Sequence, residues 1–290
     1  MAAIVEKLPK EDAEPSRYYA NGYRNIDAFL AEAKRLPVRL FEPNPTATRA
    51  TATHKERREG KRGLMKWLIE SLGRRDFDYF EFGVMSCGTF NRVIEWTPNS
   101  ESRFFGLDTF EGLPEPWVRG RKDGSLYVGR DIGDLKSASP PAVYDERATL
   151  FKGLFQDTLP DALERAFPQG RKSDRSMVVN IDSDLYSSAL YVLTSMHTLL
   201  RSGDYVYFDE FFDPLNEFSA FNDYIRSYNT KSWFVPVARA YDGMLFRIAI
   251  PAAEAPAVVI DRRSTKFLER LKAYVRARVS LLKANDPGSI

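Results

Sequence analysis

Short apolar runs alternate with helical patterns from Phe77 to Tyr228, and this alternation restricts the fold more than any other feature of the chain. Short runs rich in β-branched and aromatic residues are typical of buried strands in a parallel sheet. Strands that alternate with helices at this spacing predict a doubly wound α/β sheet. The five runs are Tyr79-Phe80-Glu81-Phe82, Arg103-Phe104-Phe105-Gly106-Leu107, Ala148-Thr149-Leu150-Phe151-Lys152, Met177-Val178-Val179-Asn180-Ile181 and Tyr205-Val206-Tyr207-Phe208.

A hairpin closes this pattern. Trp233 to Ala238 and Met244 to Ile250 have the composition of strands, and the short turn Tyr241-Asp242-Gly243 that joins them predicts an antiparallel pair. Five strand–helix units followed by a hairpin predict a Rossmann-like α/β fold. We expect a seven-stranded, mostly parallel sheet with one antiparallel strand.

Other segments flank or interrupt the alternating pattern. Asn25 to Ala33 and Arg62 to Leu72 have the periodicity of amphipathic helices, and Pro43 to Thr53 has the composition of a linker or flap. Residues 111–144 hold several prolines and glycines, which predicts a long loop of the kind that forms lids. The predicted divisions are an N-terminal helical extension or lid at 1–75, a main domain at 76–252 with the loop insertion 111–144, and a C-terminal region at 253–290 with a helix from Thr265 to Lys283.

Composition disfavours several classes of protein. The formal net charge of +2 over 290 residues gives no support to a nucleic acid or a membrane as the main partner. The single cysteine, Cys87, rules out an internal disulfide, and two histidines, His54 and His197, argue against a zinc enzyme. No apolar stretch approaches the ~18 residues of a membrane span, and the first residues lack the apolar core of a signal peptide. These features predict a cytoplasmic enzyme or binding domain.

Carboxylates directly follow the last two of the five apolar runs. Asp182-Ser183-Asp184 follows Ile181, and Asp209-Glu210 follows Phe208. In open α/β sheets the ligand crevice lies beyond the carboxyl ends of the strands, so these acids are expected to converge there. Converging hard oxygens indicate a divalent cation, a general base, or both. The plainer interpretations are that Asp184 caps the following helix and that the second pair lies in a solvated loop.

A glycine-bearing turn follows the first apolar run. It begins at Gly83, reaches Gly88, and matches neither G-x-G-x-x-G nor a phosphate loop, which disfavours a dinucleotide or a nucleoside triphosphate. Asp108 ends the second run, where a carboxylate can accept hydrogen bonds from a ribose diol. Together these features favour an adenosyl ligand that lacks a pyrophosphate. Taken singly, the glycines are equally consistent with a tight turn, and Asp108 with the cap of a turn.

Five motifs occur in order along the chain. They are Glu81-Phe82-Gly83 with Gly88, Leu107-Asp108-Thr109-Phe110-Glu111-Gly112-Leu113-Pro114, Lys152-Gly153-Leu154-Phe155-Gln156-Asp157-Thr158-Leu159-Pro160, Ile181-Asp182-Ser183-Asp184-Leu185-Tyr186 and Phe208-Asp209-Glu210-Phe211. The ordered set resembles the macrocin O-methyltransferase family, whose members are class I enzymes that use S-adenosylmethionine and magnesium to methylate sugars and natural products. The resemblance covers roughly residues 77–250.

The resemblance implies a class I methyltransferase fold, S-adenosylmethionine and Mg²⁺ as cofactors, and a role for each motif. The glycine turn would hold the methionine part of the cofactor, Asp108 its ribose, and Gly153 to Asp157 would lie near adenine. The implied cofactor-binding residues are Glu81, Gly83, Val84, Met85, Ser86, Gly88, Thr89, Asp108, Thr109, Phe110, Gly153, Leu154, Phe155 and Asp182. Asp182, Asp209 and Glu210 are the implied metal ligands, and Asp182 or Asp184 is the implied catalytic base.

The chain departs from the family pattern at three places. Ser183 stands where the family commonly has glycine, Glu210 stands where it has a second aspartate, and residues 1–75 show no match. The first two departures keep the carboxylates. We therefore expect an O-methyltransferase acting on a small hydroxylated acceptor, in a monomer or a homo-oligomer. The alternatives are an NAD-dependent oxidoreductase, which the missing G-x-G-x-x-G disfavours, and a non-catalytic nucleoside-binding protein of the same fold.

Overall fold

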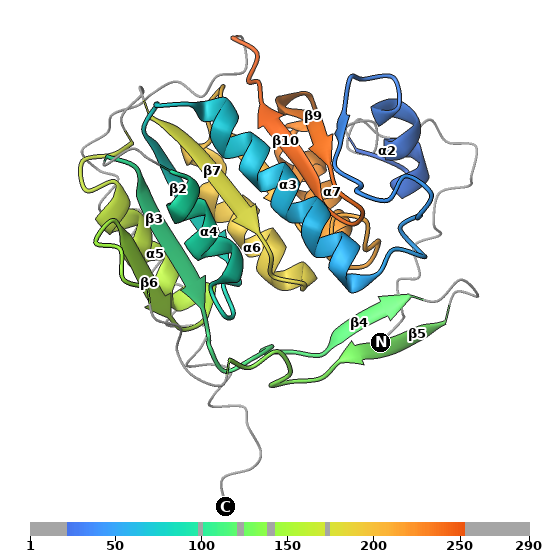
Figure 1. Ribbon diagram of the computed structural model, residues 1–290, viewed down its shortest axis with the longest axis horizontal. Helices are drawn as coiled ribbons and strands as arrows, with labels where there is room; N and C mark the ends of the chain where they lie inside the picture. The colour runs from blue at the N-terminus through green and yellow to red at the C-terminus, as the bar shows by residue number, and fades with distance from the viewer. Residues whose placement is uncertain (1–21, 98–100, 121–124, 138–142, 172–174, 253–290) are drawn as a thin grey trace, which may run out of the picture. The chain divides into compact units, whose positions relative to one another are not determined.

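The computed structural model describes residues 22–97, 101–120, 125–137, 143–171 and 175–252 (Figure 1). Its main sheet has eight strands in the order β1-β9-β10-β8-β7-β2-β3-β6, and β10 alone in this sheet runs antiparallel to its neighbours. The predicted α/β fold with one reversed strand is therefore confirmed. The predicted strand number was one too small, because the two-residue edge strand β1 is too short to show any periodicity.

The elements of the described chain follow the predicted order closely. The strands are β1 (Arg39–Leu40), β2 (Phe77–Phe82), β3 (Arg103–Asp108), β4 (Trp117–Gly120), β5 (Leu126–Arg130), β6 (Ala148–Lys152), β7 (Ser176–Ile181), β8 (Tyr205–Phe208), β9 (Phe234–Arg239) and β10 (Met244–Ile248). The helices are α2 (Ile26–Ala33), α3 (His54–Leu72), α4 (Gly88–Trp96), α5 (Phe155–Ala166), α6 (Tyr186–Met196), α7 (Glu217–Tyr228), η1 (His197–Leu199) and η2 (Lys231–Trp233).

The strands alternate their side chains between two hydrophobic cores, one on each face of the sheet. In β2, Phe80 and Phe82 enter the core shared with α2, α5, α6 and α7, whereas Phe77 and Tyr79 enter the core shared with α3 and α4. This is the period of two that an extended chain imposes. Because both faces are covered, β2 is buried at every position, which explains why its sequence reads as a continuous apolar run.

Helix α3 is longer than the sequence pattern indicates. It begins at His54 rather than Arg62, and Thr53 caps it in a capping box with Glu56. Its first two turns are polar and charged, so the apolar periodicity begins late, although the Thr53-x-x-Glu56 spacing was a readable start signal. Figure 1 shows α3 lying across the sheet, where Leu64 and Leu68 are fully buried. The extension 1–75 thus contributes its described residues to the same core.

Residues 111–144 contain a β-hairpin, where the sequence predicted only a long loop. Strands β4 and β5 pair antiparallel and form a separate two-stranded sheet. All of β5 is exposed, so it lacks the alternating burial that marks a strand in sequence. The predicted helix Thr265 to Lys283 lies outside the described residues. Within the part of the chain that the structure describes, every helix is too short or too polar to cross a membrane.

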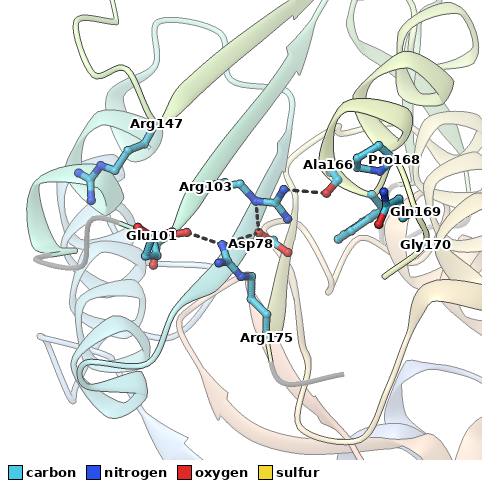
Figure 2. A pocket seen from close by; sticks show the side chains of 11 residues that line it. Asp78, Glu101, Arg103, Arg147, Ala166, Pro168, Gln169, Gly170 and Arg175 are labelled. Carbon is cyan, nitrogen blue, oxygen red and sulfur yellow. Dashed lines mark hydrogen bonds and ion pairs between the residues drawn. The ribbon is translucent and has the colours of Figure 1, made fainter. Parts of the chain in front are cut away.

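The amino-terminal edge of the sheet holds buried carboxylates, each with a guanidinium partner. The Asp78 carboxylate lies 2.8 Å from Arg103 Nε and 3.6 Å from Arg175 Nη1, beside a cavity of about 390 Å³ (Figure 2). Asp204 is bound by both terminal nitrogens of Arg171 at 2.5 Å, and both side chains are 2% exposed. Such bidentate geometry compensates the desolvation of both charges.

Candidate active site

Four neighbouring strands end at the same level and place four predicted site residues in one row. Phe82 of β2 is in register with Leu107 of β3 and with Ile181 of β7, and Ile181 is in register with Phe208 of β8. The next residues along these strands are Asp108, Gly83, Asp182 and Asp209. The chain order reverses between β2 and β7, so this row crosses the switch point at which α/β sheets bind ligands.

Gly83 has a structural requirement of its own at the centre of the row. Its φ is +94°, and a Cβ there would lie 1.9 Å from the main-chain oxygen of Asp182. Any side chain would therefore push apart the ends of β2 and β7. Beyond it, Met85 and Cys87 also adopt positive φ, as do Phe110 after β3 and Asp184 after β7. Non-glycine residues in this region carry strain of about 1–3 kcal/mol each and cluster at binding sites.

The helices that leave this edge begin without side-chain caps. Among the described residues, no side chain caps α4, α5, α6 or α7, whereas Asn25 caps α2 and Thr53 caps α3. The first turn of α4 lies beside Gly88, where an added Cβ would meet only the Ser86 hydroxyl, at 3.8 Å. Uncapped amides next to open space suit a ligand carboxylate. The turn from Gly83 to Thr89 thus fits the methionine end of the predicted cofactor.

Asp108 fixes the two loops that flank the glycine turn. Its Oδ2 accepts a hydrogen bond from the Met85 amide at 2.7 Å, and its Oδ1 accepts one from the Phe110 amide at 2.6 Å. The turn-capping interpretation therefore describes what Asp108 does in this structure. Each carboxylate oxygen can accept a second hydrogen bond, so a ribose contact is compatible with the cap. Thr109 donates to the Gly112 carbonyl at 2.8 Å and shapes the same loop.

The segment predicted to lie near adenine, Gly153 to Asp157, follows β6 and borders the row of site residues. The Gly153 amide donates to the Asp108 carbonyl at 2.9 Å, which joins the loop after β6 to the loop after β3. Leu154 is 42% exposed, and Phe155 packs edge-on against Phe82 at 5.3 Å between ring centroids. An exposed apolar side chain at this end of the sheet suits the flat face of an adenine ring.

Glu81 does not reach the crevice directly but lies buried in β2. It accepts a hydrogen bond from the Tyr79 hydroxyl, which in turn accepts one from the Asn180 amide nitrogen at 3.0 Å. Burial raises the pKa of Glu81 to about 7. Cys87 is fully buried, and burial raises its pKa to about 12, so it packs in the core and is no nucleophile.

A lysine that the sequence interpretation missed joins the two strongest acidic candidates. Lys61 Nζ lies 2.5 Å from Asp182 Oδ2 and 2.9 Å from Asp209 Oδ2. Lys61 comes from α3, one residue before the predicted start of that helix, and is separated from Asp182 by more than half of the main domain. Recognition of the Thr53 cap would have placed Lys61 inside the helix, but no local pattern pointed to its carboxylate partners.

The pKa values of the two aspartates beside Lys61 shift in opposite directions. Burial and the neighbouring Asp209 raise the pKa of Asp182 well above its usual value, against the opposing effect of Lys61. Burial acts on Asp209 too, but Lys61 and the Tyr207 hydroxyl, which donates at 2.9 Å, lower the pKa of Asp209 below its usual value. Asp209 is therefore the ionised member of the pair, and Lys61 is its counter-ion.

The remaining acids of the crevice lack comparable partners. Burial and the charge of Asp209 raise the pKa of Asp184 to about 7 and that of Glu210 to about 8. Glu217, which was not predicted as a site residue, is fully buried and has a pKa well above its usual value; its Oε1 has no hydrogen-bond partner among the described residues. Helix α6 begins after Leu185 without a side-chain cap in the described chain, so Asp184 does not cap it.

The carboxylate oxygens of the crevice suit a divalent ion, although only those of Asp182 and Asp209 converge on one point. Asp182 and Asp209 both direct one oxygen to a single cationic centre, the Lys61 ammonium, and hard carboxylate oxygens are what Mg²⁺ prefers. The Glu210 carboxylate instead lies 3.9 Å from Arg119. Accordingly, no group of three or more His, Cys, Asp or Glu side chains within the described ranges is placed to hold a metal ion. The two aspartates fit the implied metal, and Glu210 would have to turn toward them.

The β4–β5 hairpin is attached to the same crevice. The Trp117 indole donates to Asp213 Oδ2 at 3.3 Å, and Arg119 Nε lies 3.3 Å from the same oxygen while its guanidinium stacks over Trp117. The Glu115 carboxylate accepts a hydrogen bond from the Ser187 hydroxyl near the start of α6. These contacts bring a cation and an aromatic ring from the insertion next to Glu210. The sequence predicted a long loop here but not where its side chains would lie.

Comparison with known proteins gives one family match. The family model described as macrocin-O-methyltransferase (TylF) matches residues 76–235, which is more than half of the 290-residue chain. No curated protein sequence matches the chain.

Solved structures are similar to the chain at low identity, and two of the three named here are described as methyltransferases. The O-methyltransferase NovP is 18% identical over 65% of this chain and 79% of its own, with a TM-score of 0.47. The calicheamicin methyltransferase CalS11 is 18% identical over 83% of this chain and 99% of its own, with a TM-score of 0.49. A structure described as "cmcI-D160 Mg-SAM" is 16% identical over 66% of this chain and 71% of its own, with a TM-score of 0.39.

Proposed function

The chain belongs to the macrocin O-methyltransferase family and is an O-methyltransferase, and from that premise we propose that it transfers the methyl group of S-adenosylmethionine to a small-molecule hydroxyl with the help of Mg²⁺. The proposed acceptor is a sugar or another natural-product moiety. The observation that carries the proposal is the meeting of Asp182 and Asp209 at one cationic centre, beside the turn at Gly83. A cofactor turn and a cation position on adjacent strands are the two halves that metal-assisted methyl transfer needs.

Cofactor binding rests on the turn after β2 and the loop after β3. S-adenosylmethionine supplies a methyl group on a positively charged sulfur. The amides at the start of α4 would hold the carboxylate of its methionine part, and Asp108 would hold its ribose while keeping the loop amides in place. Gly153, Leu154 and Phe155 would border the adenine ring. The excess of carboxylates in the crevice favours a cationic donor over its neutral product.

Acceptor activation rests on the acids after β7 and β8. Asp182, Asp209 and Glu210 would hold Mg²⁺, which would supply the lowering of the acceptor hydroxyl's pKa and its orientation. Of the two candidate bases, Asp182 is engaged by Lys61, whereas the Asp184 carboxylate forms no hydrogen bond or ion pair with another described residue. A carboxylate with a pKa of about 7 is suited to remove a proton near neutral pH. We therefore assign the base to Asp184.

The insertion would close the crevice over the acceptor. Trp117 is nearly buried and Arg119 stacks on it, so the hairpin offers a rigid apolar and cationic wall rather than a loose loop. Such a wall would exclude water from the sulfonium and narrow the choice of acceptor. A cytoplasmic location and a homo-oligomeric state stay predictions. The NAD-dependent and non-catalytic alternatives are set aside by the family assignment.

Calorimetric titration of the purified protein with S-adenosylmethionine and S-adenosylhomocysteine tests the proposal before any acceptor is known. We expect both to bind and Asp108→Ala to weaken both. Incubation with methyl-labelled cofactor and a panel of hydroxylated metabolites, analysed by mass spectrometry with and without EDTA, then tests acceptor class and metal dependence. Absence of cofactor binding would refute the proposed donor, and full turnover in EDTA would refute the role of Mg²⁺.

A further inference from the structure

Lys61 differs from the other lysines of its helix in both environment and partners. Lys55 and Lys66 are 79% and 54% exposed and pair loosely, at 3.8 Å, with glutamates one turn away on α3. The Lys61 side chain is only 15% exposed, and its partners directly follow strands β7 and β8. Exposed pairs on one helix face are usual for lysine, whereas a nearly buried ammonium between two carboxylates is rare unless it has a role.

The backbone of α3 holds this ammonium in place. Gly60, directly before Lys61, packs so closely that an added Cβ would lie 2.5 Å from the Phe41 carbonyl oxygen. Leu64 and Met65, on the following turn, are fully buried against the sheet. The capping box at Thr53 fixes the start of the same helix. The position of Lys61 Nζ is therefore built into the packing of α3.

The ammonium occupies the space that a metal ion would take. Its nitrogen is 2.5 Å from one aspartate oxygen and 2.9 Å from the other, and Mg²⁺ bound to the same two oxygens would lie at about 2.0–2.1 Å from each. Two cations cannot share this space, because they would nearly touch in a site of low dielectric. The lysine and the ion must therefore compete for Asp182 and Asp209.

We propose that Lys61 is the resident counter-ion of the metal site, and that a divalent ion binds Asp182 and Asp209 only by displacing the Lys61 ammonium. This inference rests on the proposed function, since it concerns the same two aspartates. Lys61 keeps the two aspartates together while no metal is bound, and it lowers the affinity for metal because the ion must first displace the ammonium from both of them. It is a positioning residue that sets the metal requirement of the enzyme.

Binding of Mn²⁺ to the metal-free protein, without cofactor or acceptor, tests this inference. Electron paramagnetic resonance of free Mn²⁺ gives the Kd for wild type, Lys61→Met, Lys61→Arg and the matched control Lys66→Met. We expect Lys61→Met to bind at least tenfold more tightly than wild type, Lys66→Met to equal wild type, and Lys61→Arg to bind no more tightly. The gain should vanish in Lys61→Met/Asp209→Asn. A merely structural role for Lys61 would weaken metal binding and never strengthen it.

Thermal unfolding gives a second readout in case Lys61→Met is unstable. In EDTA this variant should unfold at a lower temperature than wild type, because Asp182 and Asp209 have lost their cation, and added Mg²⁺ should stabilise it more than it stabilises wild type. Equal or weaker Mn²⁺ binding by Lys61→Met, or tighter binding by Lys61→Arg, would overturn the inference. Failure of the proposed function looks different: wild type would then turn over fully in EDTA whatever the Lys61 variants bind.

Discussion

The two edges of the main sheet treat buried charge in opposite ways. At the amino-terminal edge, Asp78 and Asp204 each lie against arginine. At the carboxyl edge, one lysine lies between two aspartates, and three further acidic side chains lie near them. The further acids are Asp184, Glu210 and Glu217. The first edge is arranged to be stable by itself, whereas the second holds an excess of negative charge that a cation or a sulfonium ligand would relieve.

Removing a carboxylate from the crevice should have the largest effect on activity. We expect Asp209→Asn or Asp182→Asn to lower the rate of methyl transfer roughly 10³-fold, since metal-assisted activation of the acceptor is worth several kcal/mol. Cofactor affinity should change little in Asp209→Asn, because Asp209 is not among the implied cofactor-binding residues. Initial rates with labelled cofactor, alongside calorimetry, separate the two effects.

A carboxylate at the opposite edge provides the control for these variants. Asp76 is 37% exposed and lies 4.0 Å from Arg175. Asp76→Asn should retain full activity. Normal turnover in Asp209→Asn, or an equal loss in Asp76→Asn, would contradict the assignment of the crevice.

Breaking an ion pair at the amino-terminal edge should instead cost stability. Arg171→Met leaves Asp204 buried without its guanidinium, and we expect the free energy of unfolding to fall by about 3–5 kcal/mol. Activity per folded molecule should be unchanged, because the pair lies far along the strands from the crevice. Urea denaturation measures the first quantity, and assays well below the unfolding temperature measure the second.

Arg175→Met is the matched change at the same edge. The Arg175 side chain is 24% exposed, and Asp78 keeps Arg103 when it is lost, so the expected cost is about 1 kcal/mol or less. Equal losses in the two arginine variants would show that burial of the pair does not decide its value.

The position of the site residues at the carboxyl edge could be predicted from the sequence, whereas the balance of charge there could not. Asp108, Gly83, Asp182 and Asp209 could be placed because a strand's last residue is a local feature and parallel strands end at one edge. Lys61 could not be placed, because only the tertiary packing of α3 brings it to its carboxylate partners. Glu217 escaped notice because a glutamate at the start of a helix is ordinary in sequence. The β4–β5 hairpin was missed because exposed strands carry no apolar alternation.

The excess of carboxylates predicts a pH dependence of stability in the metal-free protein. Burial raises the folded-state pKa of Asp184 to about 7 and that of Glu210 to about 8, so both bind more protons when folded than when unfolded. Their stabilising protonation is complete below their unfolded pKa and is lost as the pH rises through the folded values. We expect the free energy of unfolding to fall by several kcal/mol, at most about 5 kcal/mol, between pH 5.5 and pH 8. Asp209, whose pKa is lowered, is ionised in both the folded and the unfolded state over this range and therefore does not change the slope.

Burial also raises the pKa of Glu217 well above its usual value, so Glu217 should contribute to the same slope, and Glu217→Gln tests its share. The variant removes a buried acid that carries no cationic partner in the described chain, so it should be more stable than wild type at pH 8 and similar at pH 5. Glu70→Gln, at a 63% exposed position on α3, is the control and should leave the slope unchanged. Urea denaturation at both pH values decides, and an unaltered slope in Glu217→Gln would remove Glu217 from the explanation.

The smallest effect should come from the helix caps, and it distinguishes the helix that serves the crevice from one that serves only the core. Thr53→Ala and Asn25→Ala each remove a side-chain cap, from α3 and α2 respectively, and each should cost about 1 kcal/mol of stability. Only α3 carries Lys61, so only Thr53→Ala should alter Mn²⁺ affinity, by loosening the ammonium that competes with the ion. If both variants changed metal binding equally, the link between α3 and the acids of the crevice would be general destabilisation rather than the position of one lysine.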